Sequence, residues 1–251
     1  MAIDAPRGRI PVLGETWRPV GDKAFLAAAW IVPIESVRAL VPRELAIAAV
    51  LPGRTVATAF LGDYGPGSTL EYHELGINPA LVHVGGVPAV WNHTLVVDSE
   101  PARIGGALVG APKLLLPFDW EERKRGGRVE GRCTVGDPDR PLVHVRYRQG
   151  LLPVPSPPMR AATLRDELLL VSTQQMRGKQ RLARIRFEVP AGSPLGWLRD
   201  FGDPLVGVAV TGMRGRMMDA PRVARILAHR AWRPPLPEDL HEDLHEEQPP
   251  A

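Results

Sequence analysis

The 251-residue chain is poor in cysteine and in lysine, and its apolar runs are short. Its single cysteine, Cys133, excludes an internal disulfide framework and is typical of a reducing compartment. The N-terminal segment lacks the apolar stretch of a signal peptide. No run approaches the ~20 apolar residues that a membrane-spanning helix needs. We therefore expect a soluble, cytoplasmic protein with no membrane partner.

A strong excess of one charge is also absent, since the formal net charge is only +3. The basic clusters at 123–132 and 177–186 alternate with apolar residues, which is typical of exposed strand faces. We expect no nucleic-acid partner. The acidic, proline-rich segment 233–251 contains the spacing His-Glu-Asp-Leu-His at 241–245, but a zinc peptidase needs a buried helix and a third ligand. We predict a disordered tail there and no metal site.

Lysine is scarce because only four of the 31 cationic side chains are lysines: Lys23, Lys113, Lys124 and Lys179. Lys113 lies among Leu, Val, Ala and Phe residues in the stretch 107–118. Burial disfavours the ammonium form, and a neutral amine forms Schiff bases with ketones and aldehydes. Guanidinium cannot do this chemistry. The alternative is a strand-end lysine whose head reaches water.

Periodicity and turn residues predict an α+β protein made mostly of antiparallel strands in one domain. Residues 1–20 are expected to form an irregular lead-in, 21–232 the single domain, and 151–158 a proline-rich loop. Ser99, Glu100 and Pro101 predict a helix start, with the helix running to about Val109. We expect further short helices over 34–40 and 194–201, and strands over 24–32, 54–62, 90–98, 128–135, 142–148, 167–174, 182–189 and 205–211.

Glu71, Tyr72, His73 and Glu74 bring two carboxylates, a phenol and an imidazole together after a glycine-rich turn. A carboxyl group near a Schiff-base lysine could relay protons. In an extended segment Glu71 and Glu74 face opposite ways, so one of them at most reaches a given pocket. The alternative is the polar rim of a hairpin.

Three motifs in register resemble those of the acetoacetate decarboxylase superfamily. They are Glu71–Glu74, the stretch His93–Ala102 with Asp98-Ser99-Glu100-Pro101-Ala102 at its end, and Gly110–Lys113. The resemblance covers about residues 20–120 and continues more faintly over 194–227. It implies an antiparallel, cone-like β-barrel with a few flanking short helices around an apolar pocket. It also implies a homo-oligomer without a metal or organic cofactor.

The resemblance further implies that Lys113 forms the iminium and that Glu74 is the pocket carboxylate. Lys23 falls at the family's pocket arginine, and Glu71, Tyr72 and His93 are further candidates for substrate binding. Leu114 departs from the pattern because the decarboxylase carries a second lysine there.

We therefore expect a Schiff-base lyase acting on a keto acid or ketone, with decarboxylation of a β-keto acid as the first hypothesis. The same iminium would support an aldolase or dehydratase acting on pyruvoyl-type substrates. A third hypothesis, from another class, is a non-covalent pocket protein, such as a cyclase or a binding module, in which Lys113 is structural.

Overall fold

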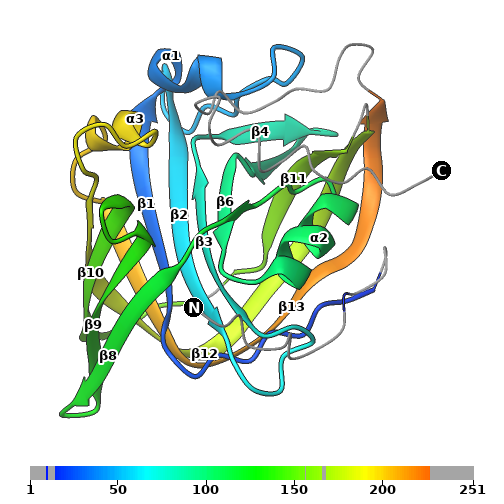
Figure 1. Ribbon diagram of the computed structural model, residues 1–251. Helices are drawn as coiled ribbons and strands as arrows, with labels where there is room; N and C mark the ends of the chain where they lie inside the picture. The colour runs from blue at the N-terminus through cyan, green and yellow to red at the C-terminus, as the bar shows by residue number, and fades with distance from the viewer. Residues whose placement is uncertain (1–9, 11–14, 156, 166–167, 227–251) are drawn as a thin grey trace.

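The computed structural model describes residues 10, 15–155, 157–165 and 168–226, with the backbone alone for 218–226. The predicted C-terminal tail lies outside these residues. The described chain is mostly sheet with a few short helices, as expected (Figure 1). The helices are α1 (Ile34–Val37), the 3-10 turn η1 (Arg38–Leu40), α2 (Glu100–Leu108) and α3 (Gly196–Arg199). The strands are β1 (Phe25–Pro33), β2 (Arg54–Tyr64), β3 (Tyr72–Asn78), β4 (Leu81–Val84), β5 (Val87–Trp91), β6 (Thr94–Val97), β7 (Leu114–Leu115), β8 (Phe118–Arg125), β9 (Arg128–Asp137), β10 (Arg140–Pro153), β11 (Met159–Arg165), β12 (Leu168–Glu188) and β13 (Val206–Ile226).

All described strands belong to one sheet, whose main path runs β4-β5-β11-β12-β13-β1-β2-β3-β6-β7. Most neighbours are antiparallel, but β5 pairs with β11 and β6 with β7 in parallel. Hydrogen bonds do not join β7 to β4, so the sheet curves around a core without closing. The expected closed antiparallel barrel is corrected to a large, open, mixed sheet.

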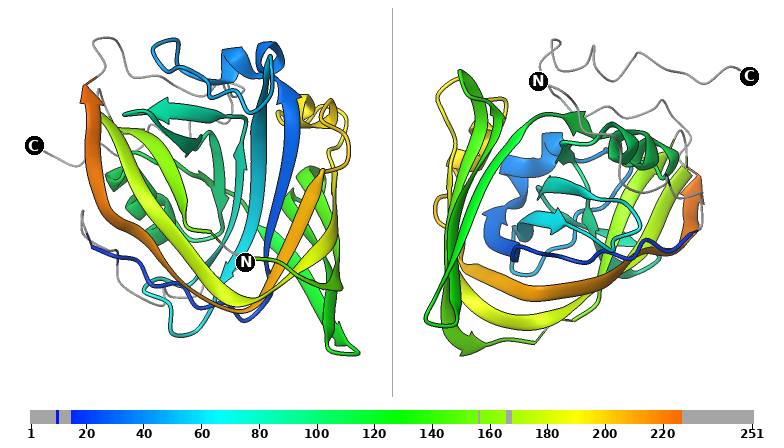
Figure 2. Two further views of the ribbon diagram at one scale, coloured as in Figure 1. Left: turned by 180° about the vertical axis from the view of Figure 1, so that it is seen from behind. Right: turned by 60° about the horizontal axis from the view of Figure 1, so that its bottom comes forward.

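The wing of the sheet, β8-β9-β10, branches from the C-terminal half of β12 (Figures 1 and 2). β12 and β13 are each 21 residues long, whereas two separate strands were expected over 167–189. That expectation was wrong because the polar stretch between them stays paired with β13 through several register shifts. Backbone pairing does not need apolar side chains where the strand is exposed. The described end of the lead-in, residues 15–20, contains two bridges to β13, formed by Trp17 and Val20.

Two apolar clusters lie on opposite faces of the central strands β1, β2, β3 and β6. The larger one extends toward the wing and includes Leu75 and Leu114, and the smaller one includes Tyr72 and Val97. Because side chains alternate along a strand, β3 sends Tyr72 and Glu74 to the smaller cluster and His73 and Leu75 away from it. The candidate site lies in the smaller cluster.

Candidate active site

The helix α2 and its C-terminal turn place Lys113. Gly110 has φ of +68°, a left-handed conformation that favours glycine, directly after the helix. The Gly110 N–H donates to the Ala107 carbonyl, and the Ala111 N–H donates to the Gly106 carbonyl. These two bonds form a Schellman motif, which ends the helix and reverses the chain. The chain then enters β7, and Lys113 is the residue just before it.

Gly106 leaves the space that the Lys113 side chain occupies. A Cβ atom built on Gly106 would lie 2.7 Å from Lys113 Cε and 2.5 Å from the Ala111 carbonyl oxygen. Glycine lowers helix propensity at this position. Its presence in α2 is therefore explained by the close approach of the lysine stem.

The strand β3 supplies the carboxylate. Glu74 and Tyr72 lie two residues apart and share a face. Gly76, on the same face, makes room for the Phe60 ring, because a Cβ there would lie 2.1 Å from a ring carbon of Phe60. The alternation of side chains along β3 and the lack of a side chain on Gly76 thus shape this wall of the site.

Lys113 and Glu74 form a buried ion pair. Lys113 Nζ lies 2.6 Å from Glu74 Oε1, and the two side chains are 5% and 6% exposed. The Tyr64 hydroxyl donates a hydrogen bond of 3.1 Å to Glu74 Oε2. Burial, reinforced by the Glu74 charge, raises the pKa of Tyr64 and of Tyr72 well above the ordinary value, so both phenols remain protonated. A buried amine, a carboxylate and two phenols therefore meet at one point.

Aromatic rings enclose the ammonium group. Lys113 Nζ lies 4.9 Å from the centre of the Tyr72 ring and 5.5 Å from that of Trp17. Such contacts stabilise a cation in a desolvated place. The Tyr72 hydroxyl is buried and has no hydrogen-bond partner among the described residues. It is a donor that a bound oxygen atom could satisfy.

A cavity of about 30 Å³ lies against this group. That volume exceeds the ~10–15 Å³ that one water requires but is well below ordinary ligand pockets. A keto acid can enter only if lining side chains move. The lining residues are Trp17, Phe60, Tyr72, Glu74, Asn92, Leu95, Val109, Ala111, Lys113, Gln174 and Met217.

Sequence reasoning missed four of the polar or aromatic residues at the site: Trp17, Tyr64, Asn92 and Gln174. Each comes from a segment distant in sequence from Lys113, and only strand pairing brings them together. Asn92 lies where the strand expected over 90–98 divides into β5 and β6. Tyr64 had one available signal, because it pairs with Tyr72 across an antiparallel ladder. That pairing could not be read before the register was known.

Three of the residues predicted for the site lie outside this lining. The Lys23 ammonium lies 5.5 Å from the centre of the Trp120 ring, toward the wing. Glu71 precedes β3 and does not line the cavity. His93 contacts Trp197 edge to face at 5.8 Å, and burial lowers its pKa to about 4, so its imidazole is neutral. Its neighbour Asn92 lines the cavity instead.

Leu114 faces away from the site. Lys113 points into the smaller cluster, whereas Leu114 is buried in the larger one. Successive side chains in an extended segment point in opposite directions. A side chain at position 114 therefore does not share the pocket with the Lys113 amine in this fold.

Among the described residues, no group of three or more His, Cys, Asp or Glu side chains could hold a metal ion. Within the same part of the chain, no helix is long and apolar enough to cross a bilayer.

A family model described as acetoacetate decarboxylase matches residues 2–164. The chain belongs to the acetoacetate decarboxylase family. A comparison with curated proteins found no sequence match. Among solved structures, the chain is similar to the enduracididine biosynthesis enzyme MppR complexed with the condensation product of pyruvate and imidazole 4-carboxaldehyde. The TM-score is 0.64 and the identity 16%, over 89% of this chain and 98% of that one.

Two further family structures resemble the fold at low identity. The acetoacetate decarboxylase of Legionella pneumophila has a TM-score of 0.63 and 11% identity, over 90% of this chain and 93% of that one. An acetoacetate decarboxylase-like enzyme from Sphingomonas wittichii RW1 has a TM-score of 0.60 and 18% identity, over 86% and 94%. At these identities the likeness concerns the fold, and the chemistry must be argued from this chain's own residues.

Proposed function

We propose that the protein is a Schiff-base lyase that decarboxylates a β-keto acid through Lys113. The observation that carries this proposal is the buried Lys113 amine with the Glu74 carboxylate 2.6 Å away. A lysine used only for solubility would not be enclosed by aromatic rings, because burial of a charged side chain is costly. Here the nearest acceptor for its proton is a carboxylate that lines the same cavity.

The first half of the proposed reaction forms the iminium. Glu74 accepts a proton from the Lys113 ammonium, and the free amine adds to the substrate carbonyl to give a carbinolamine. Glu74, now protonated, returns the proton to the departing hydroxyl, and water leaves. The Tyr64 hydroxyl holds Glu74 in place through its hydrogen bond to the second carboxylate oxygen.

In the second half, the iminium accepts the electron pair of the breaking C–C bond, so CO2 leaves and an enamine remains. Protonation of the enamine carbon and addition of water then release the ketone and regenerate the lysine. Lys113 is the only cationic side chain among the described lining residues. We therefore assign recognition of the substrate's carboxylate to the Asn92 and Gln174 amides and to the Tyr72 hydroxyl.

With a pyruvoyl-type substrate, the iminium would instead lose an α-proton to Glu74 to give an enamine, which could add to an aldehyde and lose water. This is the aldolase or dehydratase alternative. The structural similarity to MppR, whose structures contain pyruvate or a pyruvate condensation product, favours testing it alongside decarboxylation. As in the first hypothesis, the substrate would be a small keto acid held covalently by Lys113.

Borohydride trapping tests the proposal. The protein is incubated with acetoacetate, longer β-keto acids or pyruvate, then reduced and digested for mass spectrometry. We expect a reduced adduct on Lys113, its loss in Lys113→Met, and its retention in the matched control Lys179→Met. CO2 release then distinguishes the decarboxylase from the aldolase. If no keto compound gives an adduct, the covalent mechanism is wrong and the non-covalent pocket protein takes its place.

A further inference from the structure

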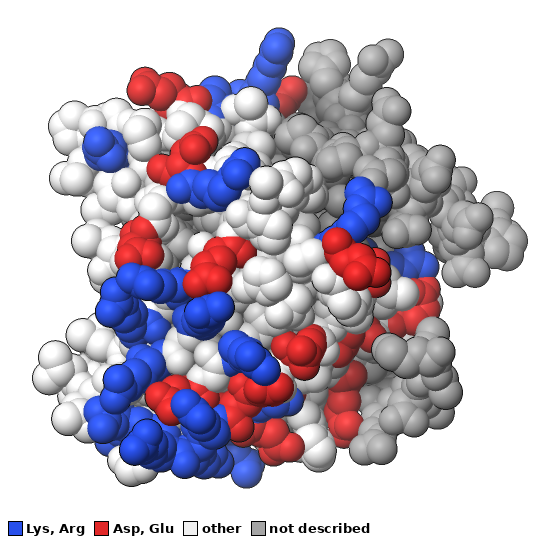
Figure 3. All heavy atoms as spheres, turned by 60° about the vertical axis from the view of Figure 1, so that its left-hand side comes forward, with Lys and Arg blue, Asp and Glu red and all other residues white. Residues whose placement is uncertain are grey.

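The outward face of the wing carries an unusual concentration of arginine. This arginine face comprises the outward positions of β8, β9 and β10 and of the C-terminal half of β12, and it holds eight arginines, four carboxylates and no lysine. Figure 3 shows the mixture of charges, with blue side chains crowded at the lower left. The inward positions of the same strands, among them Trp120, Cys133 and Ile185, lie in the core.

Cross-strand pairing places like charges side by side on this face. Arg132 is opposite Arg146, and Arg146 is opposite Arg186. In the next outward row, Arg148 is opposite Arg184. Like charges directly opposite one another in a sheet are destabilising. A face built in this way is more stable when an anionic partner covers it.

The intramolecular carboxylates neutralise only part of this charge. Glu121 pairs with Arg132 at 3.1 Å, and Glu130 is shared by Arg123 at 2.8 Å and Arg148 at 3.8 Å. Two exposed pairs are longer, Arg146 with Glu188 at 3.5 Å and Arg186 with Asp203 at 3.9 Å. The side chains of Arg125 and Arg128 make no hydrogen bond or ion pair with the described residues.

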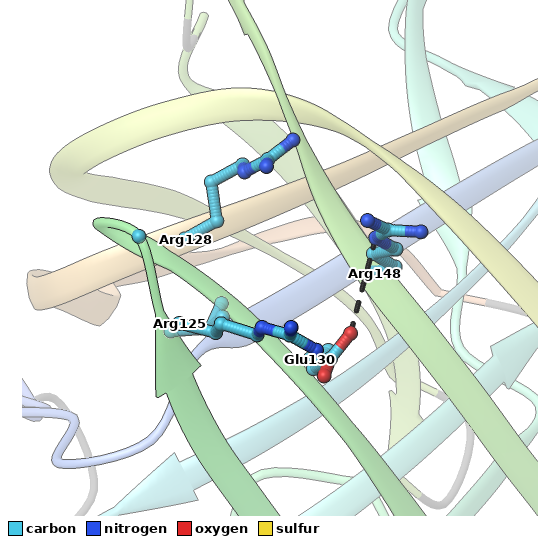
Figure 4. A pocket seen from close by; sticks show the side chains of 6 residues that line it. Arg125, Arg128, Glu130 and Arg148 are labelled. Atoms are coloured by element: carbon cyan, nitrogen blue, oxygen red, sulfur yellow. Dashed lines mark ion pairs between the residues drawn. The ribbon is translucent and has the colours of Figure 1, made fainter.

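Arg125 and Arg128 border a hollow of about 360 Å³ at the end of the β8–β9 hairpin. Figure 4 shows Arg125 and Arg148 on either side of Glu130, with Arg128 projecting beside them. Guanidinium groups bind carboxylates in a bidentate geometry, so this hollow suits a carboxylate-bearing ligand.

The chain itself contains a segment of the complementary charge. Residues 238–247 read Glu-Asp-Leu-His-Glu-Asp-Leu-His-Glu-Glu, with six carboxylates in three adjacent pairs and no lysine or arginine. The segment begins 12 residues after Ile226, the last described residue, and 12 residues can extend up to ~40 Å. β13 starts beside the wing and ends on the opposite side of the molecule (Figure 1). Ile226, the last described residue before this segment, therefore lies on the side of the molecule away from the arginine face.

We propose that the arginine face binds the acidic segment 238–247 of a second copy of this chain. Carboxylates within the face argue for a protein segment rather than a nucleic acid, because a continuous polyphosphate would meet Glu121 and Glu130 as repulsive charges. A discontinuous series of carboxylate pairs can instead alternate with them. The interaction would link copies through charge, so high salt weakens it.

The scarcity of lysine provides a direct test. Lys124 is exposed at the end of β8, beside the arginine face. Equal amounts of full-length chain in natural-abundance and 15N-labelled form are mixed and treated with a carbodiimide, which joins amines to carboxylates. We expect peptides that link Lys124 to residues 238–247 and combine the two isotopes, and we expect the links to decrease at least fivefold at 0.5 M NaCl.

Two variants of the face and one control sharpen the test. Arg132→Gln/Arg146→Gln and Arg125→Gln/Arg128→Gln should each reduce the mixed-isotope link roughly tenfold. The control Arg43→Gln/Arg160→Gln changes arginines outside this face and should leave it unchanged. Thermal melts establish that each variant is folded. If one of the two face variants does not fold, the mixed-isotope link measured in the other is sufficient to test the proposal.

Three outcomes would overturn the proposal. The first is the absence of a mixed-isotope link at low salt. The second is equal linking in the face and control variants. The third is tighter binding of the wild-type chain to a ten-phosphate oligonucleotide than to a peptide of residues 238–247, which would assign the face to nucleic acid.

Discussion

The two faces of β3 carry two ionic clusters that differ in how completely their polar groups are satisfied. On one face, Glu74 pairs with Lys113 in a nearly closed environment beside a small cavity. On the other face, His73 Nδ1 lies 2.6 Å from Asp98, and its Nε2 lies 3.1 Å from Asp63. Both ring nitrogens of His73 are thus occupied, and no donor is left for a ligand.

The electrostatics of the two clusters follow from this difference. Burial alone would lower the pKa of His73, but hydrogen bonds to Asp63 and Asp98 outweigh it and raise the pKa to about 9. The imidazolium therefore joins β2, β3 and the end of β6 as a structural contact. At Lys113 the charged pair borders a cavity and an unsatisfied phenol, an arrangement suited to chemistry. One strand thus separates a fully paired cluster from one that borders a cavity.

Breaking the buried Lys113–Glu74 pair is expected to have the largest effect on stability. Glu74→Leu leaves the Lys113 ammonium buried without a carboxylate and should lower the free energy of unfolding by ~3–5 kcal/mol. The double variant Lys113→Met/Glu74→Leu removes both charges and should recover most of that loss. Urea unfolding measures both. A double variant as unstable as the single one would show that the pair's charge is not what stabilises this wall.

The His73 cluster should respond to pH instead. Its folded pKa of about 9 exceeds the ordinary 6.5, so its stabilisation is complete below pH ~6.5 and is lost as the pH rises toward 9. The loss should be roughly 3 kcal/mol, measured by urea unfolding across this range. His73→Gln should flatten the dependence, while the exposed His83→Gln should retain it. An unchanged slope in His73→Gln would contradict the assignment.

Gly106→Ala should have a smaller effect on stability, and it should disturb the Lys113–Glu74 cluster but not the His73 cluster. The added methyl group would displace the Lys113 stem and the turn at Ala111, at a cost of ~1–3 kcal/mol. Trapping of Lys113 by borohydride should slow in parallel. Ala107→Gly is the control, since Ala107 is exposed on the same helix and its replacement changes helix propensity without adding an atom near Lys113. Equal losses in both variants would indicate a helix effect only.

The smallest effect is expected from two tyrosines that differ in one hydrogen bond. Tyr64→Phe removes the donor to Glu74 and should cost ~1 kcal/mol. Tyr72→Phe removes a hydroxyl with no partner among the described residues, so its stability should not fall, but its KM for a keto acid should rise. Thermal melts and steady-state kinetics distinguish them. If Tyr72→Phe were destabilised and Tyr64→Phe were not, Tyr72 would be the structural donor and the assignment of the two hydroxyls would be wrong.

Local patterns predicted several parts of the molecule correctly. The strand expected over 24–32 is β1, and the strands expected over 128–135 and 142–148 lie within β9 and β10, which pair antiparallel. Ser99, Glu100 and Pro101 begin α2, whose N-cap is Ser99. The Ser99 side chain makes no capping hydrogen bond, so the early proline and the acidic first turn are the local signals that remain. These features depend on properties of a few neighbouring residues and therefore can be read from the sequence.

Longer-range features could not be read in this way. Residues 168–188 form one continuous strand because they pair with β13. The strands β4 and β7 remain unpaired with each other because of the curvature of the whole sheet. The expectation of a loop over 151–158 was wrong at its start, because β10 continues to Pro153. Pairing partners decide such boundaries, and they lie tens of residues away.

The sequence by itself determined the chemistry available at the site. A single lysine in an apolar stretch, a glycine turn before it and an alternating Tyr-His-Glu segment are local properties of the chain. Only the tertiary structure decided which groups meet that lysine. It brought Glu74 to 2.6 Å, added Trp17 and Tyr64, and left Lys23, Glu71 and His93 outside the cavity. The physical reason is register: the pairing of strands far apart in sequence fixes which side chains share a face, and no short-range pattern contains that information.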